Sequence, residues 1–495
     1  MNKILINSCL VLLLTALTAC NLTNNQNQVV QGSTDLPAGI NPLYHFREIE
    51  TQINSQIYET LTELSTDLKT VLPRLAVSWT FSENTYTIRL RPDVYFHNGS
   101  KLSARDVVKS FALQKDKPVM HTLFSVVDSV KAIDDLTVAF YLKRSYPMFL
   151  QALASSFGLL IVKKDEQSGQ FSGTGPYQVE TFNPDKELIL RAVANYWAGK
   201  AEIKYVKFKF YKNRYEIEDA IIEDVVDIVY RIPGYSVDRL KWAGKIDYYV
   251  QPPRSVFFLG FNMANAPFND IRLRKAVLKA INIPPLVLNV NRGNAVVARG
   301  PLPEVLFNYN KVSQDSFNLK ESMRLIAEAG YKDGLKVNLI FPAMAFTRPM
   351  LANILQSDLA KANIQVNIIN SNSWKEHDRL VKSDRCNLFI SGGWPETAGD
   401  MEGMLHDFFY SSSPFNLMHY KNKQVDSWLD QARIEMDTIR RQELIRLSVE
   451  QILKDVPAVF LYHVKPHFAY NREKIKKLVV DPYSIIQYHR VELNK

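Results

Sequence analysis

The stretch from residue 73 to residue 111 constrains the fold more than any other part of the sequence. Apolar and polar side chains alternate along residues 86–91, a period of two that is typical of a half-buried strand. A turn at residues 82–84 precedes this strand, and residues 94–96 predict a second short strand. We therefore expect a strand pair here.

A helix follows the strand pair directly. Asn98 and Gly99 tolerate a positive φ and favour a turn. Ser103 is a suitable N-cap, and Asp106 in the first turn suits the positive end of the helix. The sequence therefore predicts strand, turn, strand, turn and capped helix in that order.

The same residues resemble, almost position by position, the signature of the family 5 extracellular solute-binding proteins. This family includes the oligopeptide- and dipeptide-binding proteins of bacterial ABC importers. The resemblance rests on Leu75-Ala76, Ser78-Trp79, Leu90-Arg91, Val94, Phe96, His97, Gly99, Leu102, Ala104, Asp106-Val107-Val108 and Ser110. Later motifs at residues 173–177, 195–200, 226–228 and 261–282 resemble the same family, and the resemblance extends from about residue 37 to residue 470.

The resemblance implies an α/β chain with the type II periplasmic-binding-protein fold. Two α/β lobes would surround a cleft, and a subdomain would be inserted in the first lobe. The expected boundaries are 36–61 with 166–257 and 461–495 for lobe I, 62–165 for the inserted subdomain, and 258–460 for lobe II. The chain would cross between the lobes near residues 257–262 and 458–463, and such hinges would let the lobes close on a ligand.

Periodicity in the second half agrees with an α/β order. Residues 319–329 predict a helix that Gly330 ends as a C-cap. Residues 335–341 and 364–369 are strand-like, and residues 350–361 predict a helix between them. This strand–helix–strand unit predicts a parallel pair with a crossover.

Residues 1–19 have the pattern of a bacterial signal peptide, with a lysine, a short apolar run and small residues before Cys20. The run is too short for a transmembrane helix, which needs about 20 apolar residues. Residues 17–20 resemble a lipobox, so we expect Cys20 to be lipidated and residues 20–35 to form a tether. The alternatives are an ordinary signal peptide cut nearby and an uncleaved anchor. Asn21 does not decide between the inner and the outer membrane.

The composition is that of an ordinary globular chain, with 46% hydrophobic and 22% charged residues. The net charge of +9 comes from scattered lysines and arginines, which argues against nucleic-acid binding. Of the three cysteines, only Cys386 would remain beside the lipid site, so no intramolecular disulfide is expected. Cys386 lies in a strand-like run and is expected to be a buried, inert thiol.

Catalytic signatures are absent from the sequence. It contains no H-E-x-x-H, G-x-S-x-G, P-loop or C-x-x-C motif, and Gly173-x-Gly175 lacks the other features of a dinucleotide loop. His406 and His419 come closest to a metal site, but such lone histidines are more often structural or solvated. We therefore expect no enzyme activity, no cofactor and no bound metal.

The candidate ligand site is a glycine-rich loop after the apolar run at residues 387–392, because ligands in α/β lobes usually bind at the carboxyl ends of strands. The resemblance implies that an Asp in this loop pairs with a peptide α-ammonium. Aligned on Gly393-Trp394, that position is Thr397, and Asp400 takes the second Asp position of the motif. Either Glu396 replaces the missing carboxylate, or the ligand has no free α-amine there. Asp400 either shapes the loop or contacts the ligand.

Three more candidates come from the same resemblance. Trp374 would join Trp394 as an aromatic wall of the site, unless both belong to the core. Arg348 would hold a ligand carboxylate through two parallel hydrogen bonds, unless it is merely an exposed arginine. Tyr44 follows an Asn-Pro segment of the first lobe and would face the cleft.

We therefore expect the substrate-binding component of an ABC importer. It would be a monomeric lipoprotein in the periplasmic space or at the cell surface that captures peptides or similar small solutes and delivers them to permease subunits. The alternative from another class is a binding-fold lipoprotein with a non-transport role, as a sensor or adhesin. Within the transport hypothesis, the solute could instead be a metal chelate, haem, a sugar or an opine.

Overall fold

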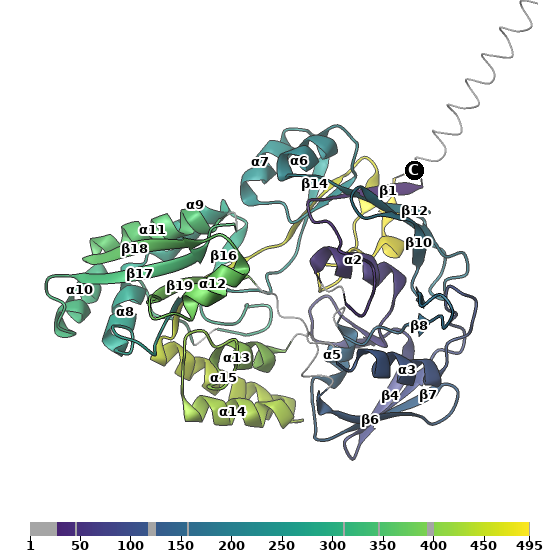
Figure 1. Cartoon of the computed structure of the whole chain (residues 1–495), viewed down its shortest axis with the longest axis horizontal. Coiled ribbons are helices and arrows are strands. Elements are labelled where there is room, and N and C mark those ends of the chain that lie inside the picture. Colours follow the sequence, from purple (N-terminus) through teal and green to yellow (C-terminus); the bar gives the residue numbers. More distant parts are fainter. Residues whose placement is uncertain are drawn as a thin grey trace, which may run out of the picture.

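The computed structural model describes residues 27–44, 47–116, 125–155, 158–309, 312–344, 347–393 and 400–494. Its larger sheets have seven, six and four strands. We call the part built on the seven-stranded sheet lobe I, the part built on the six-stranded sheet lobe II, and the part built on the four-stranded sheet the insert. Figure 1 shows lobe II on one side of the molecule, with lobe I and the insert on the other.

Lobe I is a mixed sheet in the order β10-β11-β12-β1-β13-β21-β14. Its central strand β1 pairs in parallel with both β12 and β13. The strands are β1 (Gln28–Ser33), β10 (Tyr177–Asn183), β11 (Glu187–Ala192), β12 (Tyr205–Phe210), β13 (Ile228–Tyr230), β14 (Ile246–Val250) and β21 (His467–Asn471). The helices are α2 (Glu48–Ile57), α6 (Arg214–Ile222) and α7 (Gly234–Lys241).

The position of β1 corrects the tether predicted for residues 20–35. Gln28–Ser33 form a strand of the lobe I sheet, and Val29 is fully buried in it. Asparagines and glutamines around this strand mask its signal, and its partners lie far along the chain, with Val29 opposite Val206 and Gln31 opposite Ile228. A tether can therefore comprise only residues before Gln28.

Lobe II has the strand order β16-β20-β15-β19-β17-β18. Its strands are β15 (Phe257–Phe261), β16 (Ala295–Val297), β17 (Leu335–Pro342), β18 (Ile364–Ser371), β19 (Leu388–Gly392) and β20 (Ala458–Val464). Its helices are α8 (Ile271–Ala280), α9 (Ile283–Asn291), α10 (Leu319–Glu328), α11 (Arg348–Lys361), α12 (Trp374–Val381), α13 (Met401–Phe409), α14 (Lys423–Ile434) and α15 (Thr438–Asp455).

The predicted strand–helix–strand unit is confirmed in lobe II. β17 and β18 pair in parallel along their whole length, and α11 connects them. Helix α10 ends where Gly330 takes a φ of 97°. Leu339 and Ile340 of β17 enter different apolar cores, so the sheet is covered on both faces. No helix in the described ranges is long and apolar enough to span a bilayer.

The insert contains most of the stretch from residue 73 to residue 111. Its sheet has the order β4-β5-β7-β6. Its elements are β4 (Ala76–Ser82), β5 (Thr85–Leu90), β6 (Val127–Ala132), β7 (Thr137–Leu142), α3 (Ala104–Gln114) and α5 (Phe149–Ala154). Shorter pieces elsewhere are β2 (Thr62–Leu64), β3 (Val71–Pro73), β8 (Lys163–Lys164), β9 (Phe171–Ser172), β22 (Ile475–Lys477), β23 (Glu492–Leu493) and the 3₁₀ turn Tyr488–Arg490.

Local signals in the insert are mostly confirmed. Glu83 and Asn84 have positive φ in the turn between β4 and β5. Ser103 and Asp106 form a capping box at the start of α3. The strand predicted at residues 94–96 is wrong, because this segment turns back at once and makes only an isolated bridge between Tyr95 and Lys101.

Two short connections join the lobes. The chain enters lobe II at β15 and leaves it at β20, and these strands are antiparallel neighbours. β20 stays in the lobe II sheet up to Val464, past the boundary expected after residue 460. A ring nitrogen of His463 in β20 donates to the carbonyl of Ser255 at 2.9 Å, which fixes one connection to the other.

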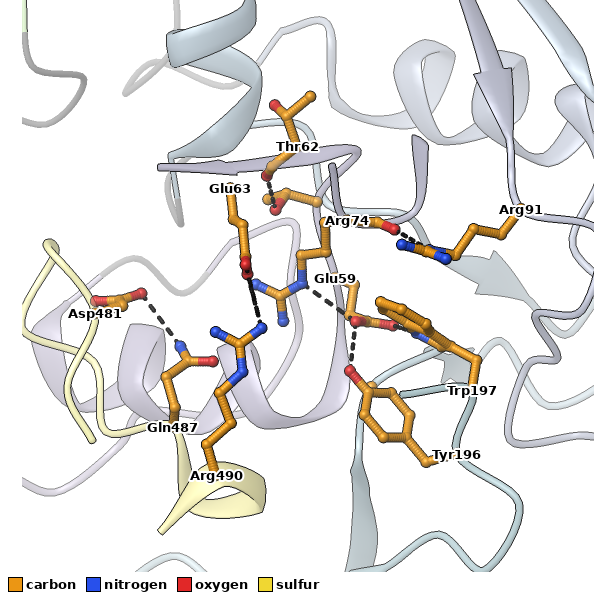
Figure 2. A network of polar contacts seen from close by, with 12 residues as sticks. Glu59, Thr62, Glu63, Arg74, Arg91, Tyr196, Trp197, Asp481, Gln487 and Arg490 are labelled. Atoms are coloured by element: carbon orange, nitrogen blue, oxygen red, sulfur yellow. Dashed lines mark hydrogen bonds and ion pairs between the residues drawn. The ribbon is translucent and has the colours of Figure 1, made fainter. Parts of the chain in front are cut away.

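A buried polar network attaches the insert to lobe I (Figure 2). Glu59 is fully buried and pairs with Nε of Arg74 at 3.2 Å. Its carboxylate also accepts hydrogen bonds from Tyr196 at 2.8 Å and from Trp197 at 3.0 Å. The guanidinium of Arg91 lies 4.3 Å over the Trp197 ring. The network therefore places a buried carboxylate and its hydrogen-bond donors at the contact between the insert and lobe I.

Candidate functional site

The parallel strands of lobe II end at one edge of the sheet, and the glycine-rich loop begins there. Gly392 and Gly393 have φ of 105° and 95°, which side chains rarely adopt. A Cβ on Gly392 would lie 2.0 Å from the carbonyl oxygen of Val256. The N–H of Gly393 donates to the same carbonyl at 3.0 Å. Glycine is therefore required for the loop to pass this close to the connection between the lobes.

Arg348 lies beside this loop as the first residue of α11. Its Nη2 donates to the carbonyl of Gly392 at 2.8 Å. Its guanidinium carbon lies 4.8 Å from the ring centroid of Phe257. Phe257 in turn stacks on Tyr462, with 4.8 Å between centroids and 15° between the planes. The arginine therefore lies at the end of three stacked groups, against the strands where the chain enters and leaves lobe II.

The charge of Arg348 has no carboxylate partner among the described residues. The residue is only 4% exposed, and its Nη1 is buried without a hydrogen-bond partner in the described ranges. Burial lowers the pKa of Arg348 to about 10, which still leaves it protonated at pH 7. A buried charge without a partner typically costs about 3–5 kcal/mol. The site can therefore accept an anionic group, which would supply the missing counter-charge.

Trp374 lies near Arg348 through one intervening side chain. It is the first residue of α12, where Ser373 caps the helix. Its ring is 6.2 Å from that of His377, and burial together with the charge of Arg348 lowers the pKa of His377. Trp374 itself is 53% exposed, so it does not belong to the core of lobe II. Its ring is therefore partly open to solvent, as a wall of the predicted site would need to be.

Asp400 makes contacts that favour a role in shaping the loop. It is 5% exposed and caps α13, accepting from the N–H of Glu402 at 3.1 Å. Its carboxylate also pairs with Arg441 at 2.6 Å. Partners within the chain therefore already satisfy this carboxylate.

The other predicted residues are not joined to this cluster by any described contact. Tyr44 is 74% exposed on lobe I. Trp394, Glu396 and Thr397 lie outside the described residues, as does Cys20 with the whole signal-peptide pattern. Cys386 is buried, as expected, and burial raises the pKa of its thiol to about 12.

Sequence reasoning missed the aromatic support of Arg348. Phe257 and Tyr462 are far from Arg348 in sequence, and only strand pairing in the lobe II sheet brings them together. The sequence signal that could have indicated this support is the pair of apolar runs at residues 257–262 and 458–463, from which the sequence predicts only hinges. No three His, Cys, Asp or Glu side chains of the described ranges gather closely enough to hold a metal ion.

The chain forms two α/β lobes joined by two short connections. At the strand ends of one lobe lies a buried cation that has no carboxylate partner among the described residues. These features are typical of a two-lobed solute-binding protein. The chain belongs to the bacterial extracellular solute-binding proteins, family 5, whose sequence profile matches residues 70–416. It is thus a solute-binding protein of the kind that serves ABC importers.

Several proteins resemble the chain over nearly its full length. The dipeptide-binding protein of Escherichia coli K12 is 25% identical over 94% of both chains. Heme-binding protein A of Haemophilus influenzae is 23% identical, covering 97% of this chain and 94% of that protein. The solved structure of HbpA2 from Haemophilus parasuis superposes with a TM-score of 0.84 at 23% identity, covering 95% of this chain and 100% of that one. The last likeness establishes the shared fold.

Proposed function

We propose that the chain is a non-enzymatic receptor that captures a carboxylate-bearing solute between its lobes and delivers it to an ABC permease. The observation that carries this proposal is Arg348, a buried cation that lacks a carboxylate among the described residues. A solute carboxylate can form charge-assisted hydrogen bonds with its guanidinium and supply the missing counter-charge.

The relatives support a solute of this chemistry. One is described as binding dipeptides and another as binding heme, and both ligands carry carboxylates. A peptide is therefore our first choice for the solute. Thr397 stands where the resemblance leads us to expect the Asp that pairs with the α-ammonium, so we further propose that Glu396 takes that role or that the solute has no free α-amine there.

The same proposal covers how the receptor reaches the membrane. Residues 17–20 support export as a lipoprotein acylated at Cys20, for example with palmitate. Residues 20–27 then form the tether to β1, which spans at most about 3.3–3.6 Å per residue. The folded part would remain close to the membrane surface as a monomer, within reach of the permease.

Calorimetry with a matched pair of peptides tests the ligand chemistry. Tri-alanine and its C-terminal amide differ only in the terminal carboxylate. We expect wild type to bind the free acid at least about tenfold more tightly than the amide, since charged hydrogen bonds are among the strong ones. Arg348→Met should bind both equally weakly, whereas Arg385→Met, which removes an exposed arginine of lobe II, should behave as wild type. Equal preference in wild type and Arg348→Met would refute the role of Arg348.

A further inference from the structure

A second cavity lies in lobe I, at the carboxyl ends of β1 and β13. Its volume is about 260 Å³, and Ser33 and Tyr230, the last residues of these two strands, line it. Ligands in open α/β sheets bind outside the carboxyl ends of the strands. The cavity is smaller than a typical site for a whole ligand, so it suits one group of a larger solute.

The cavity is bordered by positive groups. Glu48 and Arg214, the first residues of α2 and α6, both line it, so two helix N-termini meet there. Such N-termini carry partial positive charge. Arg231 adds a further guanidinium to the lining.

Arg231 is held over the cavity by an uncommon backbone conformation. Its φ is 53°, a left-handed value that is infrequent for residues other than glycine. Its Nε donates to the hydroxyl of Tyr230 at 2.9 Å, and its guanidinium lies 5.4 Å from that ring. Nη1 of Arg214 donates to the carbonyl of Tyr230 at 3.2 Å. Both arginines are therefore positioned around the end of β13.

Glu48 lies against these positive groups and provides a counter-charge for Arg231. Its carboxylate pairs with Nη1 of Arg231 at 2.8 Å. Burial raises the pKa of Glu48 to about 7, Arg231 and Arg254 lower it, and Asp35 raises it. The acid is therefore held in its charged form only weakly, and a competing anion can displace it as it takes up a proton.

The cavity lies close to the site of Arg348 along the chain. Arg254, whose charge lowers the pKa of Glu48, precedes Phe257 by three residues, and the guanidinium of Arg348 lies 4.8 Å from the ring centroid of Phe257. Three extended residues span about 10 Å. Figure 1 shows α2 on the side of its lobe that faces lobe II. The connection from lobe I into lobe II therefore runs from Arg254, whose charge acts on Glu48, to Phe257, which contacts Arg348.

We propose that this cavity is a second anion subsite, in which Arg231 and Arg214 bind a carboxylate or other oxyanion of the solute in place of Glu48. The inference rests on the proposed function and narrows it to a solute with two anionic groups, one for each lobe. Arg214 and Arg231 line the cavity, and the charge of Arg254 also acts on Glu48, against the two carboxylates of Glu48 and Asp35. A cationic group would have to enter against this balance, so an anion is the better fit.

Inorganic phosphate tests the cavity without any assumption about the solute. Thermal unfolding of the full chain is followed in sodium phosphate and in sodium chloride of equal ionic strength at pH 7. We expect phosphate to raise the midpoint of wild type and of Arg348→Met, and to raise that of Arg231→Asn by less than that of wild type, because only the Arg348 site then remains. Asparagine is chosen because it tolerates the left-handed backbone. Arg292→Asn is the matched control, because Arg292 is another exposed arginine of positive φ, and it should respond as wild type.

An equal response of wild type and Arg231→Asn, whether both rise or neither does, overturns the proposal. Loss of the response in Arg348→Met alone also overturns it, because phosphate would then bind at the other arginine.

Calorimetry with Glu-Ala-Ala, Ala-Glu-Ala and their glutamine counterparts tests the link to the solute. Wild type should bind one acidic peptide about tenfold more tightly than its glutamine match, and Arg231→Asn should lose this preference while still distinguishing a free C-terminus from an amide. Measurements in two buffers of different ionisation enthalpy should show proton uptake in wild type but not in Glu48→Gln. Retention of the preference in Arg231→Asn refutes the subsite. If no peptide binds wild type while the phosphate result holds, the peptide part of the proposed function fails and the anion subsite stands.

Discussion

The guanidinium of Arg348 lies 4.8 Å from the ring centroid of Phe257, so this cation of α11 rests on the strand by which the chain enters lobe II. The charge therefore lies beside the connection between the lobes. If a solute carboxylate binds Arg348, as proposed, it binds next to the strand where a hinge between the lobes is expected.

The unliganded protein should not lose stability when this charge is removed. Arg348→Met gives up a cation–π contact and one hydrogen bond, together worth about 1–3 kcal/mol. It also removes a buried charge that has no carboxylate partner among the described residues, and such a charge costs about 3–5 kcal/mol. We expect denaturant unfolding to show that the free energy of unfolding of Arg348→Met equals that of wild type or exceeds it by about 1 kcal/mol. A decrease of about 2 kcal/mol or more in the free energy of unfolding would mean that the charge is already neutralised within the chain. For scale, about 1.4 kcal/mol corresponds to a tenfold change in an equilibrium constant.

The network of Figure 2 predicts a large penalty at one glutamate and a small one at its neighbour. Glu59→Gln leaves the Arg74 cation, whose side chain is 11% exposed, without its partner, at a cost of about 3–5 kcal/mol. Glu63→Gln breaks a pair with Arg490, whose side chain is 46% exposed, and should cost at most about 1 kcal/mol. Denaturant unfolding of both variants checks this order, and similar losses for the two would contradict it.

His463 predicts a change of stability with pH. Burial lowers its pKa to about 4, whereas an unfolded chain titrates near 6.5. Neutral His463 therefore contributes fully above pH 6.5, and this contribution is lost as pH falls from 6.5 to 4, because only the unfolded chain then takes up the proton. The loss can reach about 3 kcal/mol.

The comparison with His463→Asn isolates this effect from the other titrating groups. Asparagine can still donate to the carbonyl of Ser255 but does not titrate. The difference in unfolding free energy between the two proteins should shrink or reverse between pH 6.5 and 4. Parallel pH profiles would show that His463 does not titrate in this way.

Local sequence signals predicted local structure well. The capping box at Ser103 and the αL glycine at residue 330 each mark a helix end through contacts within a few residues. The strand β1 was missed because its partners, β12 and β13, lie nearly two hundred residues away and its neighbours are polar. Pattern reasoning sees periodicity but not pairing across such distances.

The candidate site divides in the same way. Arg348 could be found from the sequence because the family resemblance points to it. Its burial, and its lack of a carboxylate partner among the described residues, could be seen only in the structure. The Glu48–Arg231 pair carries no sequence motif, and only the parallel pairing of β1 with β13 brings its two halves together. A site formed by the ends of strands that are distant in sequence can therefore be recognised from the fold but not from the sequence alone.

The proposed lipid anchor gives a prediction for the part of the chain before β1. Wild type should incorporate labelled palmitate in the bacterium, and Cys20→Ala should not, because it lacks the cysteine to which the lipid would be attached. The attached chains would then anchor the protein, since each buried CH₂ adds about 0.8 kcal/mol of membrane affinity. Cys386→Ala is the control, since this thiol is buried and should leave labelling unchanged. Equal labelling of wild type and Cys20→Ala would exclude acylation at this cysteine.

Mass spectrometry of the solute that co-purifies with the exported protein tests the central claim most directly. Native spectra of wild type should show one bound solute, and its fragmentation should reveal at least one carboxylate or other oxyanion. Arg348→Met, purified in parallel, should carry little or none of it, while Arg385→Met should carry as much as wild type. A retained solute without any anionic group, or equal retention by Arg348→Met, would contradict the account.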